Sequence, residues 1–167
     1  MASTFRSIVR VIAQLAALLV IAAAFFIRTP QVSGQSMEPG IQSGEYVLIN
    51  TFAYRFWRVQ RGDVLAFHHD SPTEPYLIKR VIGLPGERIA IDRGIVSIDG
   101  IPLSEPYVHF HDNRSVPALT VPIGTLYMLG DNRANSDDSR DWGVLAKPAI
   151  IGKAVAGIWP LSAFGVL

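Results

Sequence analysis

Ser36 lies in an irregular polar segment, residues 32–40, where its hydroxyl could serve as a nucleophile. A serine attacks a carbonyl only when a base within hydrogen-bond reach takes its proton. The alternative interpretation of this segment is a plain linker without a chemical role. The presence of a suitable base elsewhere in the chain therefore decides whether Ser36 indicates catalysis.

The four histidines, at positions 68, 69, 109 and 111, are one possible source of that base. His68 and His69 precede Asp70, so a Ser–His–Asp triad is conceivable, but no local signature such as G-x-S-x-G surrounds the serine. The histidine pairs could also bind a metal ion, although neither has a further ligand at a suitable spacing. We favour the interpretation that they are solvated loop residues.

Lys79 is a second candidate base, one of only three lysines against 12 arginines. It lies within Tyr76–Gly83, the most strand-like run of the sequence, on the same face as Leu77 and Val81. Burial there would favour a neutral amine, since it can lower a lysine pKa by up to ~5 units. A neutral amine can take the proton of a serine hydroxyl. The alternative is an edge strand from which Lys79 extends to solvent.

A polar segment, Gly130–Gly143, follows an apolar run and is dense in Asp, Asn, Arg and Ser. It could be a solvated cluster of turns. It could also be a calcium loop, since Asp131, Asn135 and Asp137 alternate, but Arg133 interrupts them and no glutamate follows at the EF-hand spacing. If buried, the same side chains would form an ion-paired scaffold that orients catalytic groups.

The composition excludes several classes of protein. The chain has 167 residues, of which 49% are hydrophobic and 17% charged, so it is not disordered. A net charge of +1 gives no basic patch that would indicate nucleic-acid binding. The absence of cysteine excludes disulfides, cysteine-based zinc sites and thiol catalysis.

The N-terminal region predicts a membrane anchor. Val11–Ile27 is a 17-residue apolar run with one polar interruption, which as a helix would nearly cover the hydrocarbon thickness. Arg6 and Arg10 precede it and Arg28 follows, which favours a cytoplasmic N-terminus. The alternative is a cleaved signal peptide with its small-residue site at residues 22–24. Both interpretations place residues 30–167 outside the cytoplasm.

The remainder of the chain is predicted to be mainly β, because short β-branched runs alternate with Gly and Pro. One short helix is possible around Phe52–Trp57. Arg93-Gly94 is suited to a hairpin turn. The predicted strands are Glu45–Asn50, Asp63–His68, Tyr76–Gly83, Arg88–Asp92, Ile95–Asp99, Thr125–Leu129 and Gly152–Ile158.

Four segments, in this order, resemble the type I signal peptidases of bacteria and their Ser/Lys relatives in the mitochondrial inner membrane and the thylakoid. The segments are Gly34–Pro39, Arg61–Val64, Lys79–Gly86 and Gly130–Arg140, and Trp159–Ser162 is similar to the family's ending. Together they extend over essentially the whole of residues 30–167. Each segment alone is modest evidence, whereas four in order are very specific.

The resemblance implies a role for each matching residue. Ser36 would be the nucleophile, with its backbone N–H stabilising the oxyanion, and Lys79 would be the general base. Ser136 matches the serine that orients the lysine amine. The residues that would brace the site are Arg80, Asp131, Asp138 and Arg140. No cofactor and no metal are implied.

The resemblance also implies an architecture: an anchor at residues 1–28 and an antiparallel β-sheet catalytic domain at residues 29–167. A small β insertion would occupy roughly residues 93–122. Two positions depart from the family. Gly34 stands where some members carry a serine hydroxyl that donates to the oxyanion, and Gly40 stands where threonine is usual.

The activity implied is removal of signal peptides from exported preproteins after small residues, in an Ala-X-Ala pattern. The enzyme would be a monomer in the plasma membrane, in contact with the lipid bilayer and not with nucleic acid. Phe52, Tyr54, Phe56 and Trp57 could rest in the membrane interface or pack in an ordinary core. Two alternatives remain, a specialised plasmid-transfer or organellar Ser/Lys processing peptidase and a non-catalytic, membrane-anchored peptide-binding β-domain.

Overall fold

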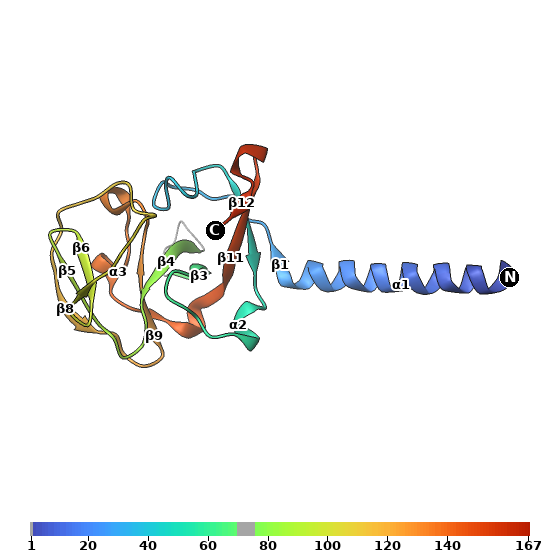
Figure 1. The fold of residues 1–167 in the computed structure, drawn as a ribbon, viewed down its shortest axis with the longest axis horizontal. Helices are drawn as coiled ribbons and strands as arrows, with labels where there is room; N and C mark the ends of the chain where they lie inside the picture. Colours follow the sequence, from blue (N-terminus) through green and yellow to red (C-terminus); the bar gives the residue numbers. More distant parts are fainter. Residues whose placement is uncertain (1, 70–75) are drawn as a thin grey trace.

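A long helix, α1 (Ala2–Phe26), extends from a body built of two antiparallel sheets (Figure 1). The structure is a computed structural model that describes residues 2–69 and 76–167, without the side chains of residues 2–4 and 22–25. Asp70, considered above as a triad member, lies outside the described residues. The prediction of a mainly β protein with an antiparallel sheet is confirmed.

The first sheet has the strand order β1-β2-β11-β3-β4-β9-β10, and β12 pairs with β11. Its strands are β1 (Ile27–Arg28), β2 (Tyr46–Asn50), β3 (Val64–Phe67), β4 (Leu77–Gly83), β9 (Thr125–Leu129), β10 (Leu145–Ala146), β11 (Ile150–Trp159) and β12 (Gly165–Val166). The second sheet has the order β7-β6-β5-β8. Its strands are β5 (Arg88–Asp92), β6 (Ile95–Ile98), β7 (Ile101–Pro102) and β8 (Val116–Thr120).

All seven strands predicted from the sequence are present, with ends that differ by at most two residues. The pattern missed β8, which contains Pro117 and is almost fully exposed, as well as four strands of two residues each. The short helix α2 (Ala53–Phe56) lies within the helical stretch that was expected. A second one-turn helix, α3 (Ser139–Trp142), was not predicted, because four polar and aromatic residues carry no helical periodicity.

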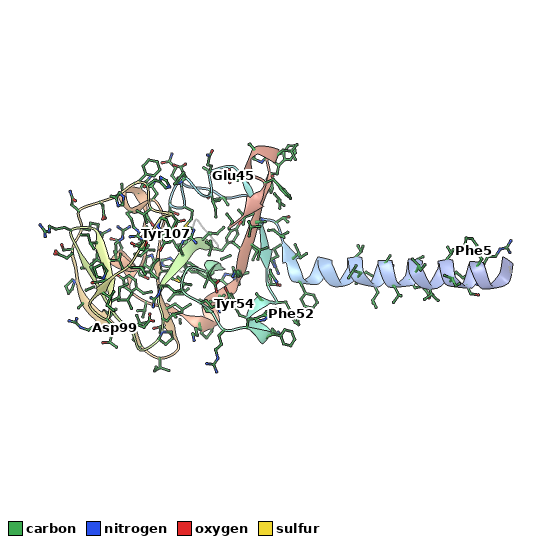
Figure 2. The ribbon with its side chains drawn as sticks, in the orientation of Figure 1. Phe5, Glu45, Phe52, Tyr54, Asp99 and Tyr107 are labelled. Carbon is green, nitrogen blue, oxygen red and sulfur yellow. The ribbon has the colours of Figure 1, made fainter. Side chains whose placement is uncertain are left out.

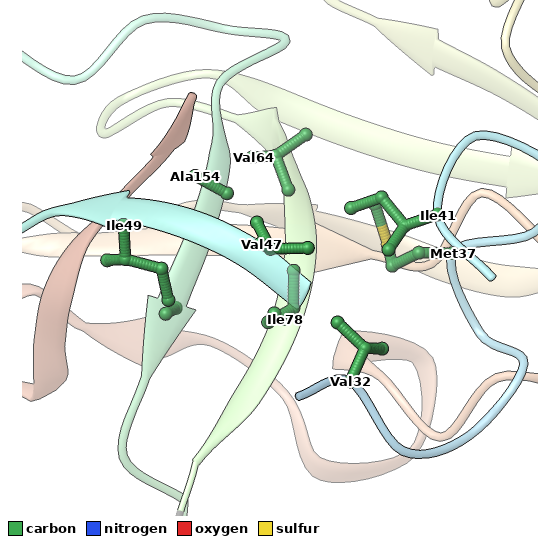
Figure 3. Close-up of a cluster of buried hydrophobic side chains, with 9 residues drawn as sticks. Val32, Met37, Ile41, Val47, Ile49, Val64, Ile78 and Ala154 are labelled. Carbon is green, nitrogen blue, oxygen red and sulfur yellow. The ribbon is translucent and has the colours of Figure 1, made fainter. Parts of the chain in front are cut away.

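Strand β4 is central, since it pairs with β3 on one side and β9 on the other. Its residues are therefore buried or half-buried along the whole strand, on both faces. A cluster of apolar side chains packs beside it and is drawn in Figure 3. Val32, Met37 and Ile41 of this cluster come from the segment that carries Ser36, so the hydrophobic core holds that segment on both sides of the serine.

The second sheet has a core of its own, formed by Ile89, Ile91, Val96 and Ile98. These side chains share one cluster with Tyr127 and Leu129 of β9 in the first sheet. Strand β9 therefore contributes to the core that joins the two sheets. The polar segment that follows β9 leaves the first sheet at this junction.

Helix α1 continues directly into the body of the protein. Ile27 and Arg28 form β1, which pairs with β2, and the amide of Thr51 donates to the carbonyl oxygen of Phe26. The described apolar side chains of the helix are exposed, including Phe5, which is labelled in Figure 2. Among the residues that the structure describes, no helix has the length and hydrophobicity needed to cross a membrane.

Candidate active site

Ser36 and Lys79 meet beside β4, a central strand of the first sheet. Lys79 Nζ donates a hydrogen bond of 2.7 Å to Ser36 Oγ, a distance within the reach that acid–base chemistry requires. Only 3% of Lys79 is exposed, because β4 is a central strand rather than an edge strand. The alternative in which Lys79 extends into solvent is therefore excluded.

The backbone around Ser36 is fixed by contacts on both sides of the residue. The carbonyl oxygen of Ser36 accepts a 2.9 Å hydrogen bond from the amide of Asn132. The side chain of Met37, the next residue, is buried in the core beside Ile41. Gly34, two residues before Ser36, has a φ of +92°, a conformation that side chains rarely adopt. This conformation favours glycine at the position where some family members carry a serine.

A cavity of about 460 Å³ opens beside the Ser36 hydroxyl. One wall is the segment before the serine, and the other is the start of β4, including Leu77 and Ile78. Asn135 and Asp137 of the polar segment border it as well. Its lining mixes apolar with polar side chains. An extended peptide is the kind of ligand that such a groove suits.

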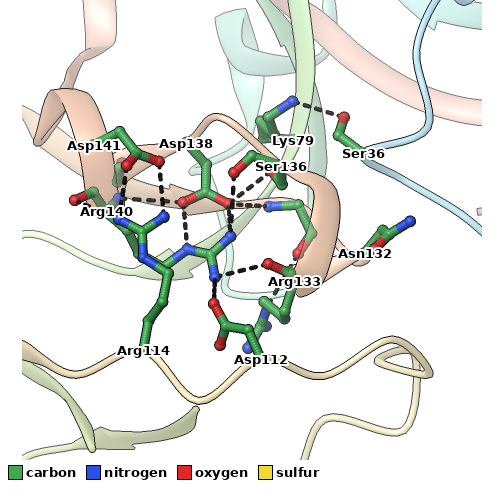
Figure 4. A network of polar contacts seen from close by, with 12 residues as sticks. Ser36, Lys79, Asp112, Arg114, Asn132, Arg133, Ser136, Asp138, Arg140 and Asp141 are labelled. Carbon is green, nitrogen blue, oxygen red and sulfur yellow. Dashed lines mark hydrogen bonds and ion pairs between the residues drawn. The ribbon is translucent and has the colours of Figure 1, made fainter. Parts of the chain in front are cut away.

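The polar segment, named here the catalytic loop (residues 130–141), is built around Asp138. The Asp138 carboxylate is fully buried and accepts hydrogen bonds from the Ser136 hydroxyl at 2.7 Å and from the Gly130 amide at 3.0 Å. Arg140 donates to both of its oxygens, each at 2.7 Å. Figure 4 shows this network beside Lys79 and Ser36. The interpretation as a solvated turn cluster is therefore wrong.

Arg80 and Asp131 form a second ion pair, with two hydrogen bonds of 2.9 and 2.6 Å between guanidinium and carboxylate. Arg80 also lies 4.3 Å from the ring centre of Tyr107. Burial alone would lower the pKa of Arg80, but the hydrogen bonds and charge of Asp131 outweigh it and raise the pKa above its ordinary value. Because both oxygens of Asp131 are used by Arg80, the calcium-loop interpretation is wrong too.

Gly130 is where the catalytic loop comes closest to the nucleophile. A Cβ atom added to it would lie 2.5 Å from the carbonyl oxygen of Ser36 and in overlap with the Ser136 hydroxyl. Only glycine allows this approach of backbone to backbone. Ser36 and Ser136 therefore both lie close to Gly130, on the side of its Cα from which a side chain would project.

The structure places the histidines away from this site. The ring of His69 packs against Trp142 at 5.0 Å, and His109 and His111 are exposed in a loop. No group of three or more His, Cys, Asp or Glu residues suited to a metal ion occurs in the described part of the chain. The backbone amide of His68 donates to the carbonyl oxygen of Ala149 and continues the edge of the sheet. Nothing here supports a triad built on histidine.

Sequence reasoning missed several residues that contact the catalytic loop. They are Glu105, Tyr107, Phe110, Asp112 and Arg114 of one connecting segment, together with Asn132 and Arg133 within the loop. The connecting segment has no periodic pattern, and its partners lie about 25 positions further along the chain. The sequence gives no clear signal for these contacts, because the loop has two arginines and four aspartates of its own, and so its charges do not require carboxylates from elsewhere in the chain.

Comparison with known proteins gives the family of this chain, which has a mainly β fold and a serine hydroxyl in contact with a buried lysine. The chain belongs to the signal peptidase family, peptidase S26, whose model matches residues 5–159. The resemblance drawn from the four sequence segments is thereby confirmed.

Individual relatives agree with this assignment. The chain is 37% identical over 151 residues to the probable signal peptidase I-1 of Synechocystis sp., which covers 86% of this chain and 77% of that protein. It is 36% identical over 147 residues to signal peptidase I of Bacillus caldolyticus, with 80% of each chain covered. A crystal structure of signal peptidase I from Enterococcus faecalis is similar, with 34% identity, a TM-score of 0.49 and coverage of 58% of this chain and 97% of that one.

Proposed function

We propose that this protein is a serine endopeptidase that removes N-terminal signal peptides from exported preproteins. The observation that carries the proposal is the 2.7 Å contact between Lys79 Nζ and Ser36 Oγ, made by a lysine that is almost fully buried. Desolvation disfavours the ammonium form of lysine and so favours the neutral amine that a general base must be. Membership of the signal peptidase family supports the same reaction.

In the proposed reaction, Ser36 Oγ attacks the carbonyl carbon of the scissile bond while its proton passes to the Lys79 amine. The oxygen of the tetrahedral intermediate accepts a hydrogen bond from the Ser36 backbone N–H. The intermediate then expels the amine of the mature protein, which takes the proton from the Lys79 ammonium. This leaves the signal peptide as an ester on Ser36. Water, deprotonated by Lys79, hydrolyses the ester and restores both side chains.

Ser136 and four charged residues complete the proposed site. Ser136 orients the Lys79 amine, and its own hydroxyl is held by Asp138. Arg140 fixes Asp138, and Arg80 with Asp131 fixes the backbone that follows Lys79. We propose that none of these four charged residues reacts. Their burial supports a bracing role, because a buried ion pair holds a single geometry when all its hydrogen bonds are made.

The proposed substrate is an extended peptide in the groove beside Ser36, cleaved after small residues in an Ala-X-Ala pattern. The lining by Val32, Met37, Leu77 and Ile78 supports the recognition of small apolar side chains. An extended backbone would pair with the strand-like stretches on either side, and the pockets between them would select the side chains. We propose that the enzyme acts as a monomer and needs neither cofactor nor metal.

We further propose that α1 anchors the enzyme in the plasma membrane, with residues 1–28 as the anchor and residues 29–167 on the outer side. The support lies in the sequence, in the apolar run Val11–Ile27 and the arginines that precede it. Extraction of membranes at alkaline pH tests the anchor, and the protein should stay with the lipid. Protease added to spheroplasts should digest the catalytic domain if the proposed orientation holds.

The test of the function is cleavage of a preprotein by the detergent-solubilised full chain. Ser36→Ala and Lys79→Ala should each abolish cleavage without lowering the melting temperature, whereas the exposed Ser43→Ala and Lys147→Ala serve as matched controls that remain active. Ser136→Ala should keep partial activity, and EDTA should have no effect. Full activity of Lys79→Ala would exclude the dyad.

A panel of preproteins separates a general enzyme from a specialised one, which would cut few of them.

A further inference from the structure

The segment between β7 and β8 lies along the catalytic loop and is here called the strap (residues 105–114). It contacts the loop or its neighbour Arg80 at five points. From the N-terminal end these are Glu105 with Arg133, Tyr107 with Arg80, the Phe110 carbonyl oxygen with the Ala134 amide, Asp112 with Arg140, and Arg114 with Asp141. The strap forms no regular secondary structure, so its conformation depends on these contacts.

We propose that the strap positions the Ser36/Lys79 pair, acting through Arg133 and Arg140 of the catalytic loop. Glu105 and Asp112 would then be positioning residues of the reaction, although neither belongs to the four segments that carry the family resemblance. The inference rests on the function proposed above and assigns a role to a part of the chain outside the groove.

Two carboxylates of the strap hold two arginines of the loop in buried ion pairs. Glu105 accepts two hydrogen bonds from Arg133, at 2.9 and 2.6 Å, and the two side chains are 9% and 4% exposed. Asp112 accepts a 2.6 Å hydrogen bond from Arg140, whose side chain is 1% exposed. Charges removed from solvent to this extent depend on their partners, since an unpaired buried charge is costly.

Both arginines act on the same residue, Gly130. Arg133 Nε donates to the carbonyl oxygen of Gly130 at 3.0 Å. Arg140 holds Asp138, which accepts from the amide of Gly130 at 3.0 Å. The strap therefore fixes Gly130 from its carbonyl side and from its amide side. Figure 4 shows Asp112, Arg140 and Asp138 in line behind Ser136.

The position of Gly130 sets the spacing of the reacting groups. The side of Gly130 from which a Cβ would project faces both the carbonyl oxygen of Ser36 and the Ser136 hydroxyl, with no room for a further atom. A second connection between the strap and Ser36 runs through the backbone. Phe110 forms a β-bridge with Asn132, and the amide of Asn132 donates to the Ser36 carbonyl oxygen. A small displacement of this loop would therefore change the geometry between nucleophile and base.

The experiment measures kcat and KM for preprotein cleavage by the full chain in detergent, for Glu105→Gln and Asp112→Asn. Each variant should lower kcat by roughly 10-fold to 10²-fold, because misplacement of reacting groups by about 1 Å costs rates of this order. KM should change less than kcat does, since no strap residue lines the groove and only Asn135 and Asp137 of the loop border it. The matched control is Glu87→Gln, which removes a similar bidentate pair with Arg61 away from the loop, and its kcat should not change.

Two further measurements separate positioning from loss of the fold. Hydrogen exchange should increase at residues 130–136 in the variants but not in β4 or β11. Asp112→Glu, which keeps the carboxylate, should recover most of kcat. If Asp112→Asn proves too unstable to fold, Asp112→Glu and Glu105→Gln still decide the question through the same two readouts.

The double variant tests the convergence on Gly130. If both carboxylates act through Gly130, the loss of kcat in the double variant should be smaller than the product of the two single losses. The proposal is overturned if both single variants keep kcat within about twofold of the parent while Ser36→Ala is inactive. An active Ser36→Ala would instead overturn the proposed function itself.

Discussion

The two sides of the active site differ in how firmly they are held. On the lysine side, Lys79, Asp131 and Asp138 are buried, and ion pairs hold the loop from both directions. On the serine side, Gln31, Ser33, Gly34 and Gln35 are exposed along the groove. A general base needs a desolvated and rigid environment, which fixes its pKa and its orientation. A nucleophile must instead remain accessible to a bulky substrate. The two sides of the site therefore differ in exposure as well as in the number of ion pairs that hold them.

The largest effect is expected from breaking the buried pair on the lysine side. Asp131→Ala removes both carboxylate oxygens that accept from the Arg80 guanidinium, leaves it the carbonyl oxygen of Gly62 as an acceptor, and leaves a charge in a largely buried position. We expect a loss of about 3–5 kcal/mol in the free energy of unfolding, together with loss of cleavage. Urea unfolding followed by circular dichroism measures it. The exposed pair of Arg93 and Asp92 provides the control, since Asp92→Ala should cost under about 1 kcal/mol.

Gly130→Ala should cause the next largest loss. The added Cβ would overlap the Ser36 carbonyl oxygen and the Ser136 hydroxyl, so the loop must move away from the nucleophile. Overpacking of this kind costs roughly 1–3 kcal/mol, and we expect activity to fall by far more than stability does. Gly165→Ala, at a position with open space around the Cβ, should have neither effect. Equal losses of activity in the two variants would contradict the close approach described for Gly130.

The loss of stability at alkaline pH tests the burial of the Tyr127 side chain, which packs behind the catalytic loop. Burial and the nearby charge of Asp138 raise the pKa of Tyr127 to about 12. Below about pH 10 the phenol is neutral in both the folded and the unfolded chain, so this contribution to stability is fully present there. As pH rises from about 10 toward 12 only the unfolded chain ionises, and stability falls by on the order of 2 kcal/mol.

Tyr127→Phe should remove the part of the stability loss at alkaline pH that comes from ionisation of Tyr127. The measurement is the change of melting temperature with pH. Burial also raises the pKa of Tyr54 and of Tyr107, so the variant should reduce the slope rather than abolish it. Tyr46→Phe, at an exposed tyrosine, should leave the slope as it is. An unchanged slope in Tyr127→Phe would show that this phenol is accessible to solvent.

The smallest change in stability is expected on the serine side. Gln35→Ala removes an exposed side chain whose amide oxygen accepts a 2.8 Å hydrogen bond from Asn135 across the groove. We expect a change within about 0.5 kcal/mol in the free energy of unfolding, because exposed contacts of this kind contribute little. A rise in KM with an unaltered melting temperature would sharpen the contrast between the two sides. A stability loss comparable to that of Asp131→Ala would remove the contrast.

Much of the first sheet and the order of the site residues could be predicted from the sequence, because they depend on local patterns. The run around Lys79 has the alternation and β-branched residues of a strand, and its position between β3 and β9 then accounts for its burial. Alternation alone could not decide between a central and an edge strand, since it contains no information about neighbours. That choice determines whether Lys79 is a base or a solvated cation.

The strap could not be predicted for a related reason. Glu105 and Asp112 occur among prolines, histidines and turn residues, and each acts only through a partner 28 positions away. Such pairs are set by tertiary packing, for which no periodicity exists in the chain. The catalytic loop has two arginines and four aspartates of its own, so its sequence did not show that further carboxylates would come from elsewhere in the chain.

The direct passage from α1 into β1 has a mechanical consequence. Phe26 ends the helix and Ile27 already pairs with Asn50, so no flexible hinge separates the helix from the sheet. The helix and the body of the protein should then rotate together as one unit. Inserting one residue into it would advance the body by about 1.5 Å but also turn it by roughly 100°. The number of residues in the helix thus determines the direction in which the groove faces, and this direction repeats with each full turn of the helix.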